Sequence, residues 1–317
     1  MRPLYKDVLA ALWLGVVIPG IVLNAAVLFA RRESPVTVST ETQPSAAETV
    51  ILRLETGEVQ LSMNDYLTGV VLAEMPASFE PDALKAQSVT AGTYARKTMV
   101  NLGKHGNGSL CGDSGCCQAY LPPEDYLRQG GAEGSVEKVR SAVESVWEYV
   151  LTYEGELIEA VYFSCSGGQT EAAVAVWGAD YPYLRSVESP GEEAARYHTD
   201  SILIPREEFL ALLDLPHDTE LYFGEPDRTE GGGVETLEIA GRSYTGVELR
   251  TLLNLRSTAF TLEQTGDHIR ISTRGYGHRV GMSQYGANAM AQTGHTWQQI
   301  LQHYYPGTNI IPYSQVR

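Results

Sequence analysis

Positive charge is scarce in this sequence of 317 residues. It holds 23 Lys and Arg against 39 Asp and Glu, which gives a formal net charge of −16 at pH 7. Four of the bases and one of the acids fall within the first 32 residues, so 23 − 4 = 19 bases and 39 − 1 = 38 acids follow, a balance of −19. A phosphate backbone would be repelled by such a field. The composition therefore excludes a nucleic-acid partner and leaves an uncharged glycan acceptable as a ligand.

Charge of either sign is missing from Val8 to Ala30, a run rich in Leu, Val, Ile and Ala. The run is long enough to span a bilayer core with some tilt. A cleaved signal peptide would have a shorter apolar run and a small-residue cleavage site, and no clear site precedes Arg31. We therefore predict that residues 1–32 form a retained transmembrane anchor of a single-pass cell-membrane protein. Two bases flank each side of the run, so charge alone does not orient it.

Apolar periodicity is missing from residues 33–48, which are rich in Ser, Thr, Pro and Glu and typical of a flexible linker. The remainder is long enough for one large domain or two small ones. We predict an α+β fold in which a central helix and two lobes face each other across a substrate groove. The first lobe comprises residues 49–190, completed by 272–317, and the second, mostly β, comprises residues 191–271.

The stretch from Tyr66 to Arg96 organises the first lobe. Leu67, Val70, Val71 and Glu74 recur at helical spacing, so a carboxylate continues an apolar stripe, and Met75-Pro76 ends the helix. A carboxyl group on such a face loses solvation, which raises its pKa. A carboxylic acid that stays protonated near neutral pH is what a glycosidase uses to protonate a leaving oxygen. The alternative is an ordinary ion pair between Glu74 and Lys85 or Arg96.

A longer helix is predicted after Pro81, which suits a first helical turn. Its interior is rich in Ala, Gly and Ser, so another backbone can pack closely and the helix should be central and buried. Lys85 and Arg96 share one face of it. These two cations either neutralise Glu74 or hold a polar substrate.

A run of glycine, cysteine and histidine, HGNGSLCGDSGCC, follows this helix. His105, Cys111 and Cys117 are spaced six and six, and thiolates with an imidazole suit zinc. Three protein ligands would leave a fourth position open, as in catalytic zinc sites. Cys116 is left out of this set, because neighbouring side chains diverge in an extended chain. The alternative is a disulfide in which Cys116 or Cys117 pairs with Cys111 or Cys165.

Two polar, glycine-rich segments complete the candidate site. The first, YFSCSGGQT, offers Ser166, Gln169 and Thr170 as hydrogen-bonding groups in a wall of the groove, although an ordinary tight turn fits the same pattern. The second, GYGHRVGMSQYGANAMAQTG, offers His278, Ser283, Gln284 and Tyr285. His278 could equally be a structural loop histidine.

Several segments of this sequence, taken in order, resemble segments of a known protein family. GVVLAEMP, ALKAQSVTAGTYAR and the two glycine-rich segments are similar to those of the stage II sporulation protein D family, over roughly Val50 to Thr308. Its members are membrane-anchored lytic transglycosylases of endospore-forming bacteria. The resemblance implies that Glu74 is the catalytic acid and that the C-terminal domain lies outside the cytoplasm. It also implies zinc, since some members bind the metal through one histidine and two cysteines at this spacing, whereas others lack it.

One position departs from the family pattern. The family's loop usually reads glycine-histidine-glycine-valine-glycine, and Arg279 here replaces the middle glycine. Either the Arg279 side chain must point away or the loop must shift, which puts the placement of His278 in doubt.

The resemblance predicts cleavage of peptidoglycan between N-acetylmuramic acid and N-acetylglucosamine, with 1,6-anhydro ends, during engulfment in sporulation. One carboxylate suffices for this reaction, whereas a glycoside hydrolase normally uses two. It also implies strands stripped of stem peptides and a complex with a sporulation amidase and a membrane scaffold protein. Two alternatives stay open: a muramidase with Glu188 or Asp180 as the second acid, and a non-catalytic wall-binding enhancer of an amidase.

Overall fold

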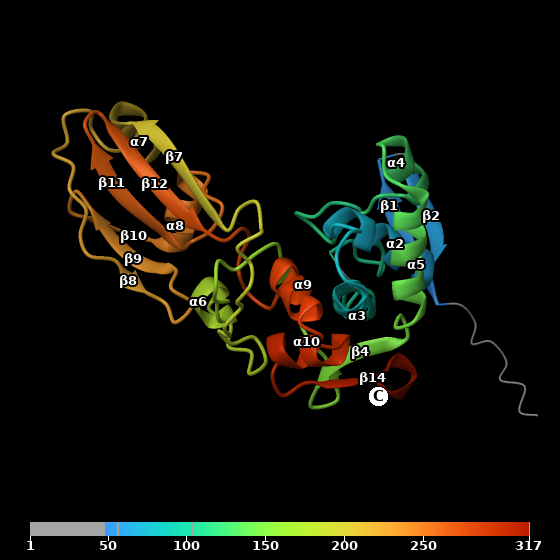
Figure 1. The fold of residues 1–317 in the computed structure, drawn as a ribbon. Helices are drawn as coiled ribbons and strands as arrows, with labels where there is room; N and C mark the ends of the chain where they lie inside the picture. Colours follow the sequence, from blue (N-terminus) through green and yellow to red (C-terminus); the bar gives the residue numbers. More distant parts are fainter. Residues whose placement is uncertain (1–47, 56, 103, 317) are drawn as a thin grey trace, which may run out of the picture. The chain divides into compact units, whose positions relative to one another are not determined.

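The computed structural model describes residues 48–55, 57–102 and 104–316. These residues form a mixed α+β fold, as predicted, with helices between small sheets (Figure 1). The predicted anchor and all of the predicted linker but Glu48 lie outside the described residues. Within the described part of the chain, no helix has both the length and the apolar character needed to cross a membrane. The described residues belong to one compact unit, so the lobe boundaries stay a prediction.

The helix that carries Glu74 is α2 (Met63–Glu74). It follows an antiparallel hairpin of β1 (Thr49–Leu54) and β2 (Gly57–Ser62), and the Ser62 hydroxyl caps it by accepting a hydrogen bond from the Asp65 N–H at 3.1 Å. The predicted apolar stripe is confirmed, because Leu67, Val70 and Val71 are fully buried.

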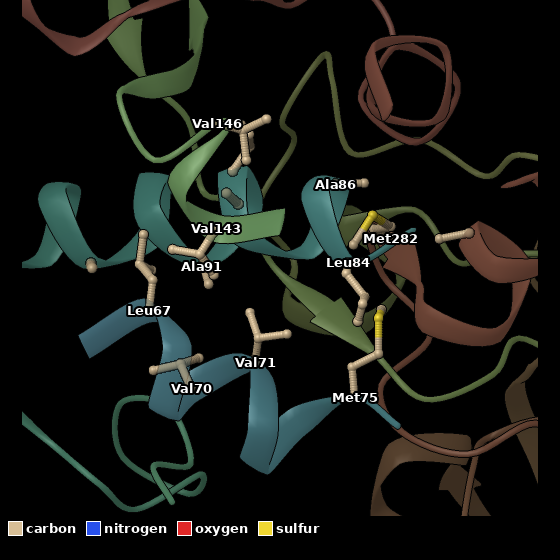
Figure 2. Packing of buried hydrophobic residues seen from close by; sticks show 14 of the residues in the cluster. Leu67, Val70, Val71, Met75, Leu84, Ala86, Ala91, Val143, Val146 and Met282 are labelled. Carbon is tan, nitrogen blue, oxygen red and sulfur yellow. The ribbon is translucent and has the colours of Figure 1, made fainter. Parts of the chain in front are cut away.

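The predicted central helix is also confirmed. It is α3 (Pro81–Val100), whose Ala83, Ala86, Ala91 and Ala95 are fully buried. Figure 2 shows Leu67 and Val71 pointing from α2 toward α3. The small residues allow this close approach: a Cβ added at Gly92 would lie 3.4 Å from Leu67 Cδ1. The helix α3 packs mainly against α2, α5 (Glu133–Glu144), α9 (Gln284–Gln292), α10 (Trp297–Tyr304) and β4 (Tyr149–Tyr153).

Short strands bring distant segments together around this helix. The strand β6 (Tyr162–Phe163) runs parallel to β13 (Met282–Ser283), with Phe163 opposite Ser283. This pairing joins the two polar, glycine-rich segments. The strand β3 (Leu110–Cys111) runs parallel to β1 and places Cys111 beside Arg53. The remaining elements here are β5 (Glu156–Leu157), β14 (Asn309–Pro312), α4 (Pro123–Arg128), α6 (Ala173–Trp177) and the 3₁₀ turn Tyr313–Gln315.

Residues 199–274 build their own cluster of buried apolar side chains, centred on residues such as Phe209, Ile239 and Leu249. Two three-stranded sheets and two helices supply it. The elements are β7 (Thr199–Pro205), α7 (Arg206–Leu212), β8 (Asp227–Arg228), β9 (Val234–Ile239), β10 (Arg242–Thr245), α8 (Gly246–Leu252), β11 (Phe260–Thr265) and β12 (His268–Arg274). Thr245 and Glu248 form a capping box that starts α8.

Candidate active site and thiol-rich loop

Glu74 is the last residue of α2, because Met75 turns to an extended conformation ahead of Pro76. Its Oε1 accepts a hydrogen bond from the Ala119 N–H at 2.8 Å. Burial raises the pKa of Glu74, and the hydrogen bond from the Ala119 N–H offsets only part of this rise. The carboxyl group is therefore poised to hold a proton at a higher pH than a solvated glutamate does.

Glu74 lines a cavity of about 710 Å³. Its walls come from the end of α2, from α3, from the end of the thiol-rich run and the segment after it, and from β6, α8, the loop before β13 and the start of α9. The polar and aromatic side chains in this lining are those of Glu74, Tyr94, Ser114, Cys117, Gln118, Tyr162, Phe163, Ser164, Arg250, Tyr276, His278 and Gln284. The cavity thus joins sequence segments that were predicted to form one site.

A segment that no motif indicated, residues 118–120, fixes α2 in place. Gln118 Nε2 donates to the Tyr66 hydroxyl at 3.0 Å, and the Tyr162 hydroxyl donates to Gln118 Oε1 at 3.0 Å. The Tyr120 ring stacks beside Tyr66, with ring centroids 6.1 Å apart. It covers Gly69 so closely that a Cβ there would lie 2.2 Å from a ring carbon. The donor to Glu74 therefore sits in a segment tightly fixed against α2.

The thiol-rich loop ends where this segment begins. His105 Nε2 lies 3.6 Å from Cys117 Sγ and 3.7 Å from Cys116 Sγ, and the two sulfurs are 4.0 Å apart. With Cys111 Sγ, these ligand atoms all lie within 4.8 Å of one another. The N–H groups of Cys116 and Cys117 both donate to the Asp113 carbonyl. This turn places the neighbouring thiols together, whereas the extended chain assumed from the sequence would separate them.

These distances fit a tetrahedral metal. Zn–S bonds of about 2.3 Å and Zn–N bonds of about 2.05 Å at tetrahedral angles give S···N and S···S edges of roughly 3.6 and 3.8 Å. The observed spacing of 3.6–4.0 Å among three of the four atoms is close to this geometry. All four cysteines are free thiols, and Cys165 lies outside the cluster, bonded through its backbone to Tyr276.

Two of the predicted substrate-binding residues, His278 and Gln284, line the cavity. Burial, assisted by the nearby Arg250 charge, lowers the pKa of His278 to about 4, so its ring is neutral near pH 7. His278 Nδ1 accepts a hydrogen bond from the Val280 N–H at 3.1 Å. The ring also lies beside Trp177, with centroids 5.1 Å apart, and Trp177 is 46% exposed rather than part of the core.

Ser166 and Ser283 do not line the cavity but meet at Glu192, which is 1% exposed. The Ser166 N–H and hydroxyl donate to one Glu192 oxygen at 2.7 and 2.8 Å. The hydroxyls of Ser283 and Ser189 donate to the other. Glu192 therefore ties the two glycine-rich segments together, and no local pattern in the sequence marked it.

The remaining predicted substrate-binding residues lie away from the cavity lining. Gln169 donates to the Ser186 hydroxyl at 2.9 Å, and the Thr170 hydroxyl accepts from the Val187 N–H at 2.8 Å. The Tyr285 ring packs edge-on against Phe79. These contacts are structural in character.

The two cations predicted to face Glu74 are also elsewhere. Lys85 does not line the cavity. Arg96 is 1% exposed, forms an ion pair with Glu48 at 2.6 Å, and lies over the Tyr313 ring. Neither ion pair that would have made Glu74 an ordinary carboxylate occurs among the described residues.

Arg279, the departure from the family pattern, is accommodated without moving its loop to the surface. Its φ of 64° is the left-handed conformation that favours glycine, and its side chain turns inward. The guanidinium pairs with Glu171 at 3.1 Å and donates to the carbonyls of Ser166, Gln169 and Gly231. His278, next in the chain, keeps its place in the cavity lining.

Comparison with known proteins agrees with these features. Residues 56–153 match the family described as Stage II sporulation protein. The chain is 38% identical to stage II sporulation protein D of Bacillus subtilis (strain 168) over 255 residues, which cover 79% of this chain and 74% of that protein. The chain belongs to this family. The resemblance drawn from the sequence blocks is therefore confirmed.

Two further proteins are similar to this chain. Stage II sporulation protein D of Bacillus amyloliquefaciens is 37% identical over 255 residues, which cover 79% of this chain and 74% of that protein. A protein named amidase enhancer in Bacillus subtilis (strain 168) is 30% identical over 303 residues, which cover 78% of this chain and 40% of the enhancer. The chain thus belongs to a sporulation family that is related to an amidase enhancer.

Proposed function

We propose that this chain is a lytic transglycosylase that cleaves peptidoglycan glycan strands in cell-wall remodelling during sporulation. The observation that carries the proposal is the single carboxyl group of the cavity. Among the described residues of the lining, Glu74 alone has one, and burial raises its pKa. Glu188 and Asp180, the second acids that a muramidase would need, do not line the cavity. A hydrolase of the usual kind uses two flanking carboxyl groups, so the arrangement favours a reaction without water.

In the proposed reaction, Glu74 donates its proton to the bridging oxygen as the bond from that oxygen to the muramic acid anomeric carbon breaks. The 6-hydroxyl of the same muramic acid attacks the anomeric carbon and forms the 1,6-anhydro bond. Its proton passes to the Glu74 carboxylate, which restores the acid. Atoms balance without water. The Ala119 N–H holds the carboxyl group in place through both proton transfers.

We further propose that the thiol-rich loop holds zinc through His105, Cys111 and Cys117, with Cys116 as fourth ligand. A set of three cysteines and one histidine is typical of closed, structural zinc sites. Bound there, the metal would fix the loop that leads into Ala119. The open position expected from the sequence would then be filled by Cys116, and zinc would take no part in bond cleavage.

The location of the chain and its partners are part of the same proposal. The C-terminal domain would lie outside the cytoplasm, held by an anchor in residues 1–32 and a linker in residues 33–48. Its substrate would be glycan stripped of stem peptides by an amidase, and a membrane scaffold protein would complete the assembly. The amidase enhancer among the relatives supports an amidase link.

Mass spectrometry of products tests this function directly. Purified protein is incubated with glycan strands freed of stem peptides, and the new ends are identified. We expect 1,6-anhydro-muramic acid ends. Reducing ends would instead identify a muramidase. If no new ends form and an added amidase is accelerated, the chain is a non-catalytic enhancer, which is the second candidate that the 30% identical relative favours.

A further inference from the structure

Arg250 is the one cationic side chain among the described residues that line the Glu74 cavity. It lies on α8 (Gly246–Leu252), which belongs to the second cluster of buried residues, and the sequence motifs gave no indication of it. Lys85 and Arg96, the cations that the sequence suggested, are absent from this lining. The cavity's cation is thus supplied from outside the signature blocks.

Arg250 has no acidic partner among the described residues. Its Nε donates a hydrogen bond to the Leu255 carbonyl at 3.3 Å, and no carboxylate lies within ion-pair distance of it in the described chain. It is half-buried, and burial lowers its pKa, although an arginine stays charged throughout the physiological range. A partly desolvated cation without a counter-ion favours binding of an anion.

The rest of the cavity does not supply that anion. Burial raises the pKa of Glu74, no ion pair joins Glu74 to Arg250 among the described residues, and His278 is neutral near pH 7. The whole chain carries a net charge of −16, so an anionic ligand approaching elsewhere would be repelled. Arg250 places a positive charge in the cavity of this otherwise negatively charged chain.

We propose that Arg250 binds the carboxylate of the 3-O-lactyl group of muramic acid, and so selects glycan from which stem peptides have been removed. This inference rests on the proposed function. N-acetylated sugars are neutral, so the lactyl group is the anionic part of the bare strand. When a stem peptide is attached, the same carbonyl carbon is an amide without charge. The lactyl ether and the anomeric carbon belong to one ring, so placing that ring at Glu74 brings the lactyl group into the same cavity.

Guanidinium geometry suits this task. Arginine presents parallel N–H groups that match a carboxylate bidentately, whereas lysine offers a point charge. Arg250 is therefore a specificity-determining residue that acts on the ground-state complex as well as on cleavage. It explains chemically why a reaction that frees the lactyl carboxylate, amide hydrolysis, must come first.

Binding to the full-length Glu74→Gln protein tests the inference without cleavage. Isothermal titration calorimetry compares two tetrasaccharides of alternating N-acetylglucosamine and N-acetylmuramic acid, one with free lactyl carboxylates and one with these converted to methylamides. We expect the free acid to bind about 10- to 100-fold more tightly, the range for a charged hydrogen-bonded contact. The preference should shrink as salt is raised.

Variants in the same Glu74→Gln background assign the preference to its residue. Arg250→Gln should bind both ligands equally, and Arg250→Lys should keep part of the preference. Arg270→Gln, which removes an exposed arginine paired with Glu263 on the neighbouring hairpin, should keep all of it. Equal binding of both ligands while Arg250 is intact would overturn the inference, even if Arg250→Gln fails to fold. A preference that survives in folded Arg250→Gln would overturn it as well.

The proposed activity and the proposed role of Arg250 can be refuted independently of each other. If wild-type protein makes no anhydro ends, the proposed activity is wrong, yet the carboxylate preference in this titration still stands. If anhydro ends form but the preference is absent, the activity stands and the role of Arg250 is wrong.

Discussion

Replacing Glu74 by Gln separates the chemistry of this side chain from its packing. Glutamine has nearly the same shape, and its carbonyl oxygen can still accept the Ala119 N–H hydrogen bond, 2.8 Å long in the native chain. It cannot transfer a proton. Loss of a general acid costs about 10²- to 10⁴-fold in rate, which corresponds to roughly 3–5 kcal/mol of transition-state stabilisation. We expect Glu74→Gln to lower the rate of glycan cleavage by at least that range while substrate binding persists.

The same substitution should change stability in a pH-dependent way. The pKa of Glu74 is raised in the folded state above its ordinary value of 4.5, so folding favours the protonated form. The associated stability is fully present below pH 4.5 and is lost as the pH rises through the folded-state pKa. Glutamine stays neutral throughout and avoids this loss. The variant should therefore match the wild type in stability in acid and exceed it at a pH above the folded-state pKa of Glu74, where a tenfold difference between the folded and unfolded acid constants corresponds to about 1.4 kcal/mol.

Urea unfolding from pH 4 to pH 8 measures this difference, and product analysis on the same samples measures cleavage. Glu144→Gln is a matched control, because Glu144 also ends a helix, α5, but is exposed. It should leave both readouts unchanged. Wild-type cleavage by folded Glu74→Gln would refute the role of Glu74 as acid. A stability difference that is flat with pH, or that favours the wild type at neutral pH, would refute the reasoning from burial.

The other predictions concern the metal, a buried ion pair and the anchor. Cys116→Ser should weaken zinc binding and alter the thiolate absorption of the cobalt-substituted protein, whereas Cys165→Ser should change neither. If the two variants bind zinc equally well, Cys116 is not a ligand. Arg279→Met should destabilise the fold by about 3–5 kcal/mol, because it leaves Glu171 without its cation and three carbonyls without a donor. A free energy of unfolding in urea within about 1 kcal/mol of the wild-type value would contradict this. Deletion of residues 1–32 should yield a soluble, active protein, and aggregation that detergent reverses would show that this segment packs with the domain.

Local patterns predicted much of the fold. Helical spacing identified the buried face of α2, and small residues identified α3 as the central helix. Pro81 located the first turn of α3. These features depend on neighbours along the chain, so their periodicity and turn chemistry can be read from it directly.

The sequence was less informative about contacts that depend on the folded backbone. An extended chain predicts that the neighbouring side chains of Cys116 and Cys117 diverge, whereas a turn at Asp113 places their thiols 4.0 Å apart. Arg250 lies in a segment without any motif and enters the cavity only through tertiary structure. Polar residues in a glycine-rich segment suggest ligand contacts, yet Ser166 bonds to the buried carboxylate of Glu192.

That carboxylate has a consequence for genetic studies of this protein. Glu192 receives hydrogen bonds from Ser166, Ser189 and Ser283, so loss of any one of these hydroxyls leaves a buried acceptor short of a donor. A screen that scores only wall lysis would count such alleles as active-site lesions. Their growth defects should instead be temperature-sensitive and relieved by stabilising second-site mutations, whereas no such suppressor can replace the proton of Glu74.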